Sequence, residues 1–333
     1  MTAALAVERP ATATPSRGPR GLVWAMLRLH RWALWCWALL VAVGAGALLW
    51  AWGPGAAAAW AEYYEMACDT VTPGDLACDY TGAAYARYDS VVGTAAALIG
   101  IVPFLTAAWA GGALIGRELE SGTAQLAWTQ SVCPARWLAA KLAVPAALLV
   151  SGTLVLTLLH HMLWSADGAL RQVNSSRHWY AGTTFEANGT LATAYVLLGL
   201  AVGVLAGLLQ RRALAALGTA VVGLAILTAA LRALRPHLWP VETLTGKRGY
   251  PEWTGMVVGD GALTSTGARV PDPHCDTAKC YADHDVVGYY RDYHPSSHFW
   301  PLQLVETGIA LAVAGLAVLA AFALLRRRTG AAV

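Results

Sequence analysis

The chain has 333 residues, of which 57% are hydrophobic and only 13% are charged. A soluble globular domain carries roughly a quarter charged residues, so a large soluble core does not explain this composition. The net charge of +3 is too small to indicate a nucleic-acid-binding protein, and we expect no nucleic acid among the partners.

Six continuous apolar blocks are each long enough to cross a bilayer, which takes roughly 20 helical residues. Five of them hold no Asp, Glu, Lys or Arg, and the sixth holds only Glu306. A charge at the centre of a span costs at least ~2.5–3.5 kcal/mol, so these charge-free stretches are informative. Alternating barrel strands are excluded, and helices satisfy their own backbone groups in lipid. The sequence predicts an all-α polytopic membrane protein with six transmembrane helices, at 33–52, 91–115, 142–164, 191–209, 213–231 and 302–325.

Clusters of arginine predict the orientation, because Lys and Arg concentrate on the cytoplasmic side of a membrane. Such clusters precede the first block, separate the fourth from the fifth and follow the sixth: Arg28, Arg31, Arg211, Arg212 and 326–328. We therefore place both termini in the cytoplasm and the protein in the plasma membrane as a multi-pass protein. Cleavage of the first block as a signal peptide is disfavoured, since about thirty residues precede it and it is long enough to span.

Residues 1–20 are rich in Ala, Thr, Pro and Arg and are predicted to form a disordered cytoplasmic tail. Residues 21–333 are predicted to form a single transmembrane domain. The segments 53–90, 165–190 and 232–301 then face outward. The last is long enough to have local order, and we expect short helices packed on the outer mouth, some re-entrant near Pro236–Trp239 and His298–Pro301.

Four of the six cysteines lie in these outer segments, where the environment is oxidising. They are Cys68, Cys78, Cys275 and Cys280. Two local disulfides are the simpler interpretation, although four cysteines allow three pairings. A metal site formed by His274, Cys275, Cys280 and His284 is the alternative, which we do not favour because zinc spacings are usually tighter. Cys36 and Cys133 are expected to be free thiols.

No sequence motif indicates a catalytic centre. There is no Walker A loop, H-E-x-x-H, G-x-S-x-G or dinucleotide fingerprint. His160-His161 is read as an interfacial pair satisfied by water, with an intramembrane metal or haem enzyme as the weaker alternative. Glu306 is the only acid within a predicted span, and two interpretations stay open: a functional polar site, or a side chain that reaches water near the membrane edge.

The segment between the second and third blocks is the most informative cytoplasmic stretch. It reads R-E-L-E-S-G-T-A-Q-L-A-W-T-Q-S-V from Arg117, followed by P-A-R-W-L-A-A-K up to Lys141. The pattern predicts a short amphipathic helix at the inner surface, with a tight bend at Gly122. Pro134 suits the start of the next helix, and Arg136 and Lys141 are placed to snorkel to lipid phosphates.

These residues resemble the cytoplasmic signature of type-2 ABC exporter permeases, especially those of high-GC actinobacteria, in which L-A-W-T-Q-S-V recurs. The resemblance implies a half-transporter that pairs with a second permease copy and with separate ATPase subunits, which carry ATP and Mg²⁺. No cofactor is expected on this chain, and the ATPase activity is expected elsewhere. The signature would act as a coupling helix that contacts the ATPase through Glu118, Glu120, Gly122 and Thr123. Arg136 and Lys141 would anchor its return to the membrane.

The function implied by the resemblance is ATP-driven export by alternating access between two states. Spans lined with Ala, Leu, Val and Trp suit an amphipathic or lipophilic cargo. The cargo's identity and the choice between homodimer and heterodimer stay open. The alternative from a different class is a membrane-anchored sensor or binding protein whose active part is the 232–301 segment.

Overall fold

The computed structural model describes residues 18–65, 82–130, 132–166, 168–171, 177–247, 249–251 and 255–330. The predicted tail, except for residues 18–20, lies outside these ranges, and so do Cys68 and Cys78. Residues 18–20 begin the short helix α1, Gly18–Leu29, which a break at His30 separates from the first span.

The described part of the chain has six helices that are long and apolar enough to cross a membrane, as the sequence predicts. Each contains one predicted block and extends beyond one or both of its ends. Their bounds are Arg31–Glu65, Ala83–Glu120, Pro134–Ala166, Leu191–Gln210, Ala213–His237 and Ser296–Thr329.

These spans are built from the following helical elements. The first comprises α2 (Arg31–Trp50), the π-helix η1 (Ala51–Gly55) and α3 (Ala56–Glu65), and the second comprises α4 (Ala83–Trp109), the π-helix η3 (Ala110–Gly116) and α5 (Arg117–Glu120). The third, fourth and fifth are α7 (Pro134–Ala166), α9 (Leu191–Gln210) and α10 (Ala213–Leu234) with η6 (Arg235–His237), and the last is η7 (Ser296–His298) with α12 (Phe299–Thr329). Short helices between them are α6 (Thr123–Thr129), η4 (Gly168–Arg171) and α8 (Gly182–Ala187).

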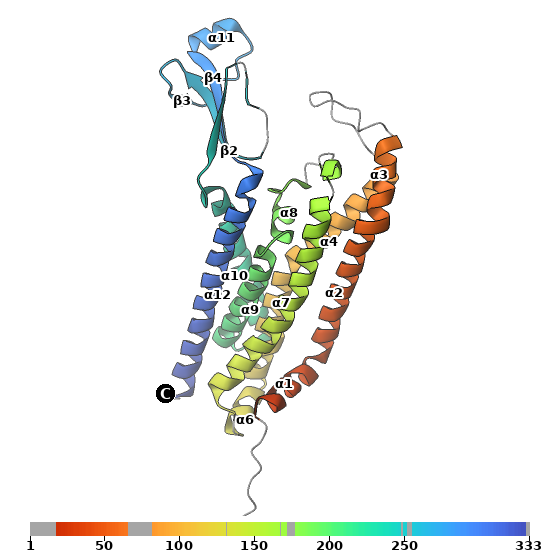
Figure 1. Ribbon diagram of the computed structural model, residues 1–333. Helices are drawn as coiled ribbons and strands as arrows, with labels where there is room; N and C mark the ends of the chain where they lie inside the picture. The colour runs from red at the N-terminus through yellow and green to blue at the C-terminus, as the bar shows by residue number, and fades with distance from the viewer. Residues whose placement is uncertain are drawn as a thin grey trace, which may run out of the picture.

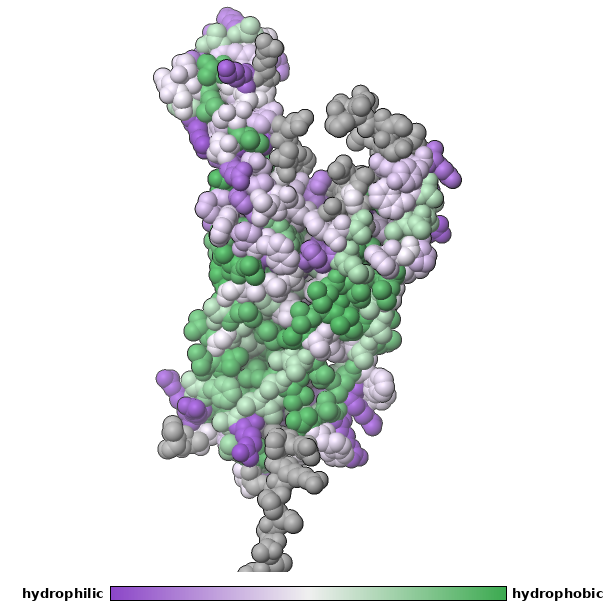
Figure 2. All heavy atoms as spheres, in the orientation of Figure 1, coloured by the Kyte–Doolittle hydropathy of each residue, from purple (hydrophilic) through white to green (hydrophobic). Residues whose placement is uncertain are grey.

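The spans run roughly side by side, with α1 and the end of α12 at one end of the bundle and a β-sheet beyond the other (Figure 1). We call these the terminal end and the sheet end. A belt of apolar side chains surrounds the bundle, and hydrophilic side chains gather beyond it at both ends (Figure 2). This is the surface expected of a chain whose middle faces lipid and whose ends face water.

Helix α9 lies at the centre of the bundle and packs closely on α4. An added Cβ atom at Gly203 would lie 2.6 Å from the carbonyl oxygen of Ala107, and one at Gly199 would lie 2.4 Å from that of Pro103. These glycines let the two backbones approach, as small residues do in membrane bundles. Gly199 and Gly203 are therefore used for packing within the chain.

The described residues between 242 and 294 include a four-stranded antiparallel sheet, which corrects the expectation that this segment forms short helices. Runs of β-branched and aromatic residues such as V-V-G-Y-Y favour strands over helices. The strands are β1 (Glu242–Gly246), β2 (Met256–Thr264), β3 (Arg269–Val270) and β4 (Val286–His294), in the order β1-β4-β2-β3.

The sheet is tied together by pairs across its strands. Opposite Asp260 in β2 lies Arg291 in β4, and their side chains form an ion pair at 3.4 Å. The short helix α11, Ala278–Asp283, precedes β4 at the far tip. The described 236–239 and 298–301 stretches are the end of η6 with the residues after it, and the start of α12, not re-entrant loops.

Candidate functional site

The second span continues past the apolar belt into a helix–turn–helix element at the terminal end, formed by α5, Ser121-Gly122 and α6. Gly122 has φ of 75°, a left-handed conformation that glycine adopts without steric cost. The hydroxyl of Thr123 donates to the carbonyl of Glu118 at 3.3 Å and lies 3.0 Å from the Ser121 hydroxyl. Gly122 and Thr123 thus shape the turn between the two short helices.

Glu118 points back toward the bundle and forms an ion pair with Lys141 of α7. The side chain of Lys141 is 3% exposed and that of Glu118 is 16% exposed. The ammonium also lies 5.5 Å from the ring centre of Trp137, within the range of a cation–π contact. Lys141 is therefore buried and paired, which corrects the expectation that it reaches lipid phosphates. Arg136 remains exposed near the start of α7.

Glu120 links the same element to a different span. Its carboxylate accepts a hydrogen bond of 2.9 Å from the backbone N–H of Ala213, the first residue of α10. The first N–H groups of a helix lack intrahelical partners, and a carboxylate there is favoured by the helix dipole. The two acids of α5 therefore join it to α7 and α10.

Helix α6 has one buried and one open face. Ala124 is fully buried, and Trp128 packs edge-on against Trp137 of α7 with ring centres 5.5 Å apart. On the open side Leu126 is 59% exposed. The exposed residues of the whole element are Arg117, Glu120, Ser121, Thr123, Gln125, Leu126, Thr129 and Gln130.

Glu306 lies in a cluster of charged residues near the sheet end. It is fully buried, and its carboxylate accepts hydrogen bonds of 2.7 Å and 3.1 Å from the guanidinium of Arg235. Tyr195 of α9 donates a further hydrogen bond at 2.5 Å. Of the two interpretations left open by the sequence, the one in which Glu306 reaches water is therefore wrong.

Glu186 of α8 completes this cluster. Its carboxylate accepts from Arg232 at 2.6 Å and 2.8 Å and from Arg235 at 3.3 Å. Two acids and two bases balance, which offsets the cost of burying Glu186, Arg235 and Glu306. Arg232 and Arg235 continue the fifth span beyond its predicted end at 231, so the cluster joins α8, α9, α10 with η6, and α12. These partners of Glu306 were not predicted from the sequence, although an acid within a span itself indicates that a cation lies nearby.

The structure bears on three other expectations from the sequence, which concern His160 and the cysteines. His160 is 2% exposed and its Nδ1 lies 2.7 Å from the side-chain oxygen of Asn188, so it is a core residue and not an interfacial one. Cys275 and Cys280 form a disulfide in the structure, so their thiols are not available for the alternative metal site. Cys36 and Cys133 are free and exposed.

The fold defines a class, the polytopic helical membrane proteins with six spans. The family model described as "ABC-2 membrane transporter related" matches residues 35–235, and the chain belongs to this family. No curated protein and no solved structure matches the chain. The matched region ends at Arg235 of the charged cluster, before the sheet and the last span. Membership makes the chain a membrane transport component that is not itself catalytic, and implies an ABC ATPase partner and a bilayer setting.

Proposed function

We propose that the chain is the membrane subunit of an ABC exporter in the plasma membrane, working as a half-transporter with a second permease copy. The ATPase is a separate subunit that holds ATP and Mg²⁺. The observation that carries this proposal is the element α5–α6, which is fixed to two spans on one face and open on the other. A segment built in this way suits the transmission of movement from a partner into the bundle.

The open face of α6 is the proposed contact with the ATPase. Thr123 and Leu126 are exposed on it, whereas Glu118 is turned inward to Lys141. We therefore assign Glu118 and Glu120 to the transmission step: movement of α6 passes through Glu118 to α7 and through Glu120 to the start of α10. Gly122 fixes the angle between the two short helices.

ATP binding favours one of two states of the assembly, and hydrolysis returns it to the other, which is alternating access. Movement of α10 relative to α9 alters the packing of the central helix, on which α4 also rests. The cargo that suits this path is amphipathic or lipophilic, because the spans present almost wholly apolar side chains along their length.

Replacement of one exposed residue tests the ATPase contact. Leu126→Ser removes an exposed apolar side chain from α6 and is expected to weaken ATPase binding by about tenfold, or roughly 1.4 kcal/mol. Leu214→Ser, which changes an 83% exposed leucine at the start of α10, is the matched control and should leave binding unchanged. The measurement is co-purification of the ATPase with each variant. Equal binding by wild type and Leu126→Ser would contradict the assigned contact.

The orientation is tested through Cys133, which is free and exposed next to α7. A membrane-impermeant maleimide should react with it in inside-out vesicles and not in right-side-out vesicles. Labelling of Cys133 itself from the outside of intact cells would place the α5–α6 element on the wrong side of the membrane for an ATPase. The exporter proposal would then be wrong.

The alternative, a sensor that uses the outer segment, is given weight by the folded sheet at 242–294. Removal of β2 to β4 separates the two functions. An exporter should retain its ATPase binding after this deletion, whereas a sensor should lose its ligand response and be indifferent to Leu126→Ser.

A further inference from the structure

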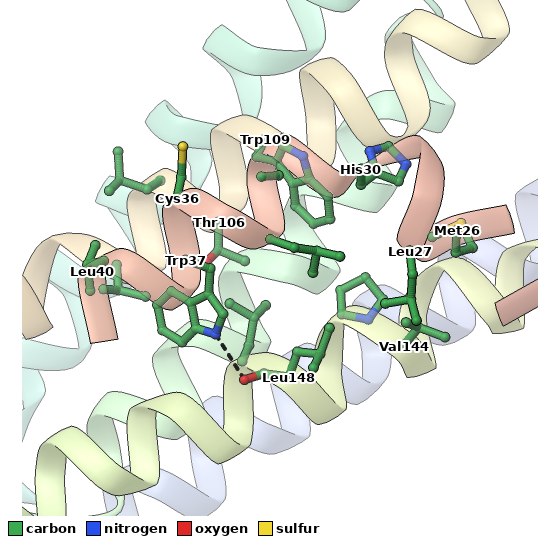
Figure 3. A pocket seen from close by; sticks show the side chains of 16 residues that line it. Met26, Leu27, His30, Cys36, Trp37, Leu40, Thr106, Trp109, Val144 and Leu148 are labelled. Atoms are coloured by element: carbon green, nitrogen blue, oxygen red, sulfur yellow. Dashed lines mark hydrogen bonds between the residues drawn. The ribbon is translucent and has the colours of Figure 1, made fainter. Parts of the chain in front are cut away.

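A groove of about 310 Å³ lies between the first three spans near the terminal end (Figure 3). Helices α1 and α2 form one wall, α4 the second and α7 the third. Its lining is almost wholly apolar, with His30, Cys36 and Thr106 among the few exceptions. The volume is in the range of small-molecule sites, at its lower end.

The groove is elongated along the bundle. On one wall it extends from His30 to Leu40, which corresponds to about 15 Å of helix. Toward the sheet end α2 and α7 come together, since the indole of Trp37 donates to the carbonyl of Leu148 at 3.1 Å. Gly152 leaves space for the same ring, because an added Cβ atom would lie 2.5 Å from it. The groove therefore runs along α2.

The groove opens sideways as well as toward the terminal end. Leu105, which lines it, is 52% exposed on the apolar belt, and Cys36 is also exposed. Only a molecule already within the bilayer reaches such an opening, because the surrounding surface is apolar and is covered by lipid.

Two arginines lie near His30, a residue that lines the groove, although neither arginine lines the groove itself. Arg28 and Arg31 flank His30, and their guanidinium groups lie 5.0 Å and 5.6 Å from the ring centres of Trp24 and Trp32. Both side chains are exposed, and neither is paired with a carboxylate among the described residues. The Nε2 atom of His30 is buried and has no hydrogen-bond partner in the described part of the chain. These groups suit an anionic oxygen-bearing headgroup, since arginine binds phosphate with paired hydrogen bonds.

We propose that this groove binds an acyl chain of an anionic membrane lipid, with the lipid phosphate at Arg28 and Arg31. The chain lies along α2 between the aromatic rings of Trp37 and Trp109, and His30 donates a hydrogen bond to the headgroup. Basic residues at a membrane surface attract anionic lipid headgroups, and this attraction adds to the favourable burial of the acyl chain. The site belongs to one copy of the protein and does not depend on an ATPase or on transport.

The test uses the full chain in lipid nanodiscs, with phosphatidylglycerol that carries a photoreactive acyl chain as the probe. We expect peptide mapping to place its crosslinks on α1, α2, α4 and α7 at residues that line the groove. Leu105→Trp fills the opening and should reduce these crosslinks about tenfold. Ile101→Trp is the matched control, because Ile101 lies one turn earlier on α4, is 48% exposed and does not line the groove. It should leave the crosslinks unchanged.

The headgroup is tested separately. Arg28→Gln with Arg31→Gln should abolish the preference for the phosphatidylglycerol probe over the same probe with a phosphatidylcholine headgroup. Two results would overturn the lipid site: a crosslink yield that is unchanged in Leu105→Trp, or one that decreases as much in Ile101→Trp as in Leu105→Trp. So would extraction of a non-lipid molecule that Leu105→Trp removes, since the groove would then be a cargo site. Unfolding measurements of each variant in the same nanodiscs show whether a loss of crosslinks reflects loss of fold.

Discussion

Both ends of the bundle are held together by charges, but the two arrangements differ in burial and in number. At the sheet end Glu186, Arg235 and Glu306 are each no more than 6% exposed and form a neutral cluster with Arg232. At the terminal end a single ion pair and one helix cap fix α5, and the outer face of α6 stays open. The sheet end is therefore built as a fixed junction of several elements, and the terminal end as an attachment point for a partner.

The largest effect is expected from Arg235→Ala, which leaves Glu306 buried without its cation. Breaking a buried ion pair in this way costs about 3–5 kcal/mol of unfolding free energy. Denaturant unfolding in micelles measures it. Arg232→Ala is the control, because its side chain is 49% exposed and Glu186 keeps Arg235, so the loss should be much smaller. The double variant Arg235→Leu with Glu306→Leu should recover most of the stability, and equal losses in all three variants would contradict the view of a buried junction.

An intermediate effect is expected from Gly116→Ala, which tests how tightly the terminal end is packed. An added Cβ atom there would lie 2.5 Å from the Gly111 carbonyl oxygen and 3.0 Å from the Ala213 Cα atom. Both obstacles are backbone atoms, so overpacking should cost about 1–3 kcal/mol. Gly218→Ala on α10 is the control, since no atom lies within 4 Å of its added Cβ. If Gly116→Ala and Gly218→Ala unfold at the same temperature, the helices at the terminal end are packed less tightly than the structure shows.

A smaller effect on stability and a larger one on coupling are expected from Lys141→Met. The variant leaves Glu118 without its cation, but Glu118 is 16% exposed and can be hydrated, and the burial cost of the Lys141 ammonium is removed. The change in unfolding free energy should therefore be only about 1 kcal/mol. Glu118 then no longer transmits movement to α7, and ATPase activity should become independent of cargo while ATPase binding persists. Arg136→Met, at an exposed position near the start of α7, is the control. Normal coupling in Lys141→Met would remove Glu118 from the transmission step.

The smallest effect is expected when the pH is lowered, and it acts through His294 at the end of β4. Burial lowers the pKa of His294; the hydrogen bond to the Pro236 carbonyl opposes this, and the nearby His298 and His237 lower it further. The fold thus favours the neutral ring of His294. Its contribution to stability is full above the pKa of histidine in the unfolded chain, about 6.5, and declines as the pH falls below that value. Limited proteolysis of the sheet at about pH 7.5 and about pH 5 tests this. His294→Gln should reduce the pH dependence; an unchanged response would assign it to other groups.

The spans were predictable from the sequence because hydrophobicity over 20 residues is a local property. The fourth span shows this best: the predicted 191–209 and the observed Leu191–Gln210 differ by one residue. The other spans extend further than predicted, because polar residues such as Arg232 and Arg235 continue a helix once partners neutralise them. The sheet was not predicted, since glycine interrupts the two longer strands, β2 and β4, and the other two, β1 and β3, are short.

The candidate site was predictable only as a segment. Gly122 was expected at a tight bend, and its φ of 75° is consistent with that requirement. The direction of Glu118 was not predictable, because a sequence pattern gives the polar face of a short helix but not which neighbouring helix lies beside it. Nor did the pattern separate residues available to a partner, such as Leu126, from those used within the chain.

By itself the sequence determined the number of apolar spans and the polar segments that separate them. These follow from the cost of placing charge and bare backbone in hydrocarbon, which depends only on neighbours along the chain. Only the tertiary structure decided that Glu306 pairs with Arg235 and Glu118 with Lys141, and that the apolar groove opens beside Leu105. Those contacts join residues distant in sequence, so they exist only once the helices have packed around α9.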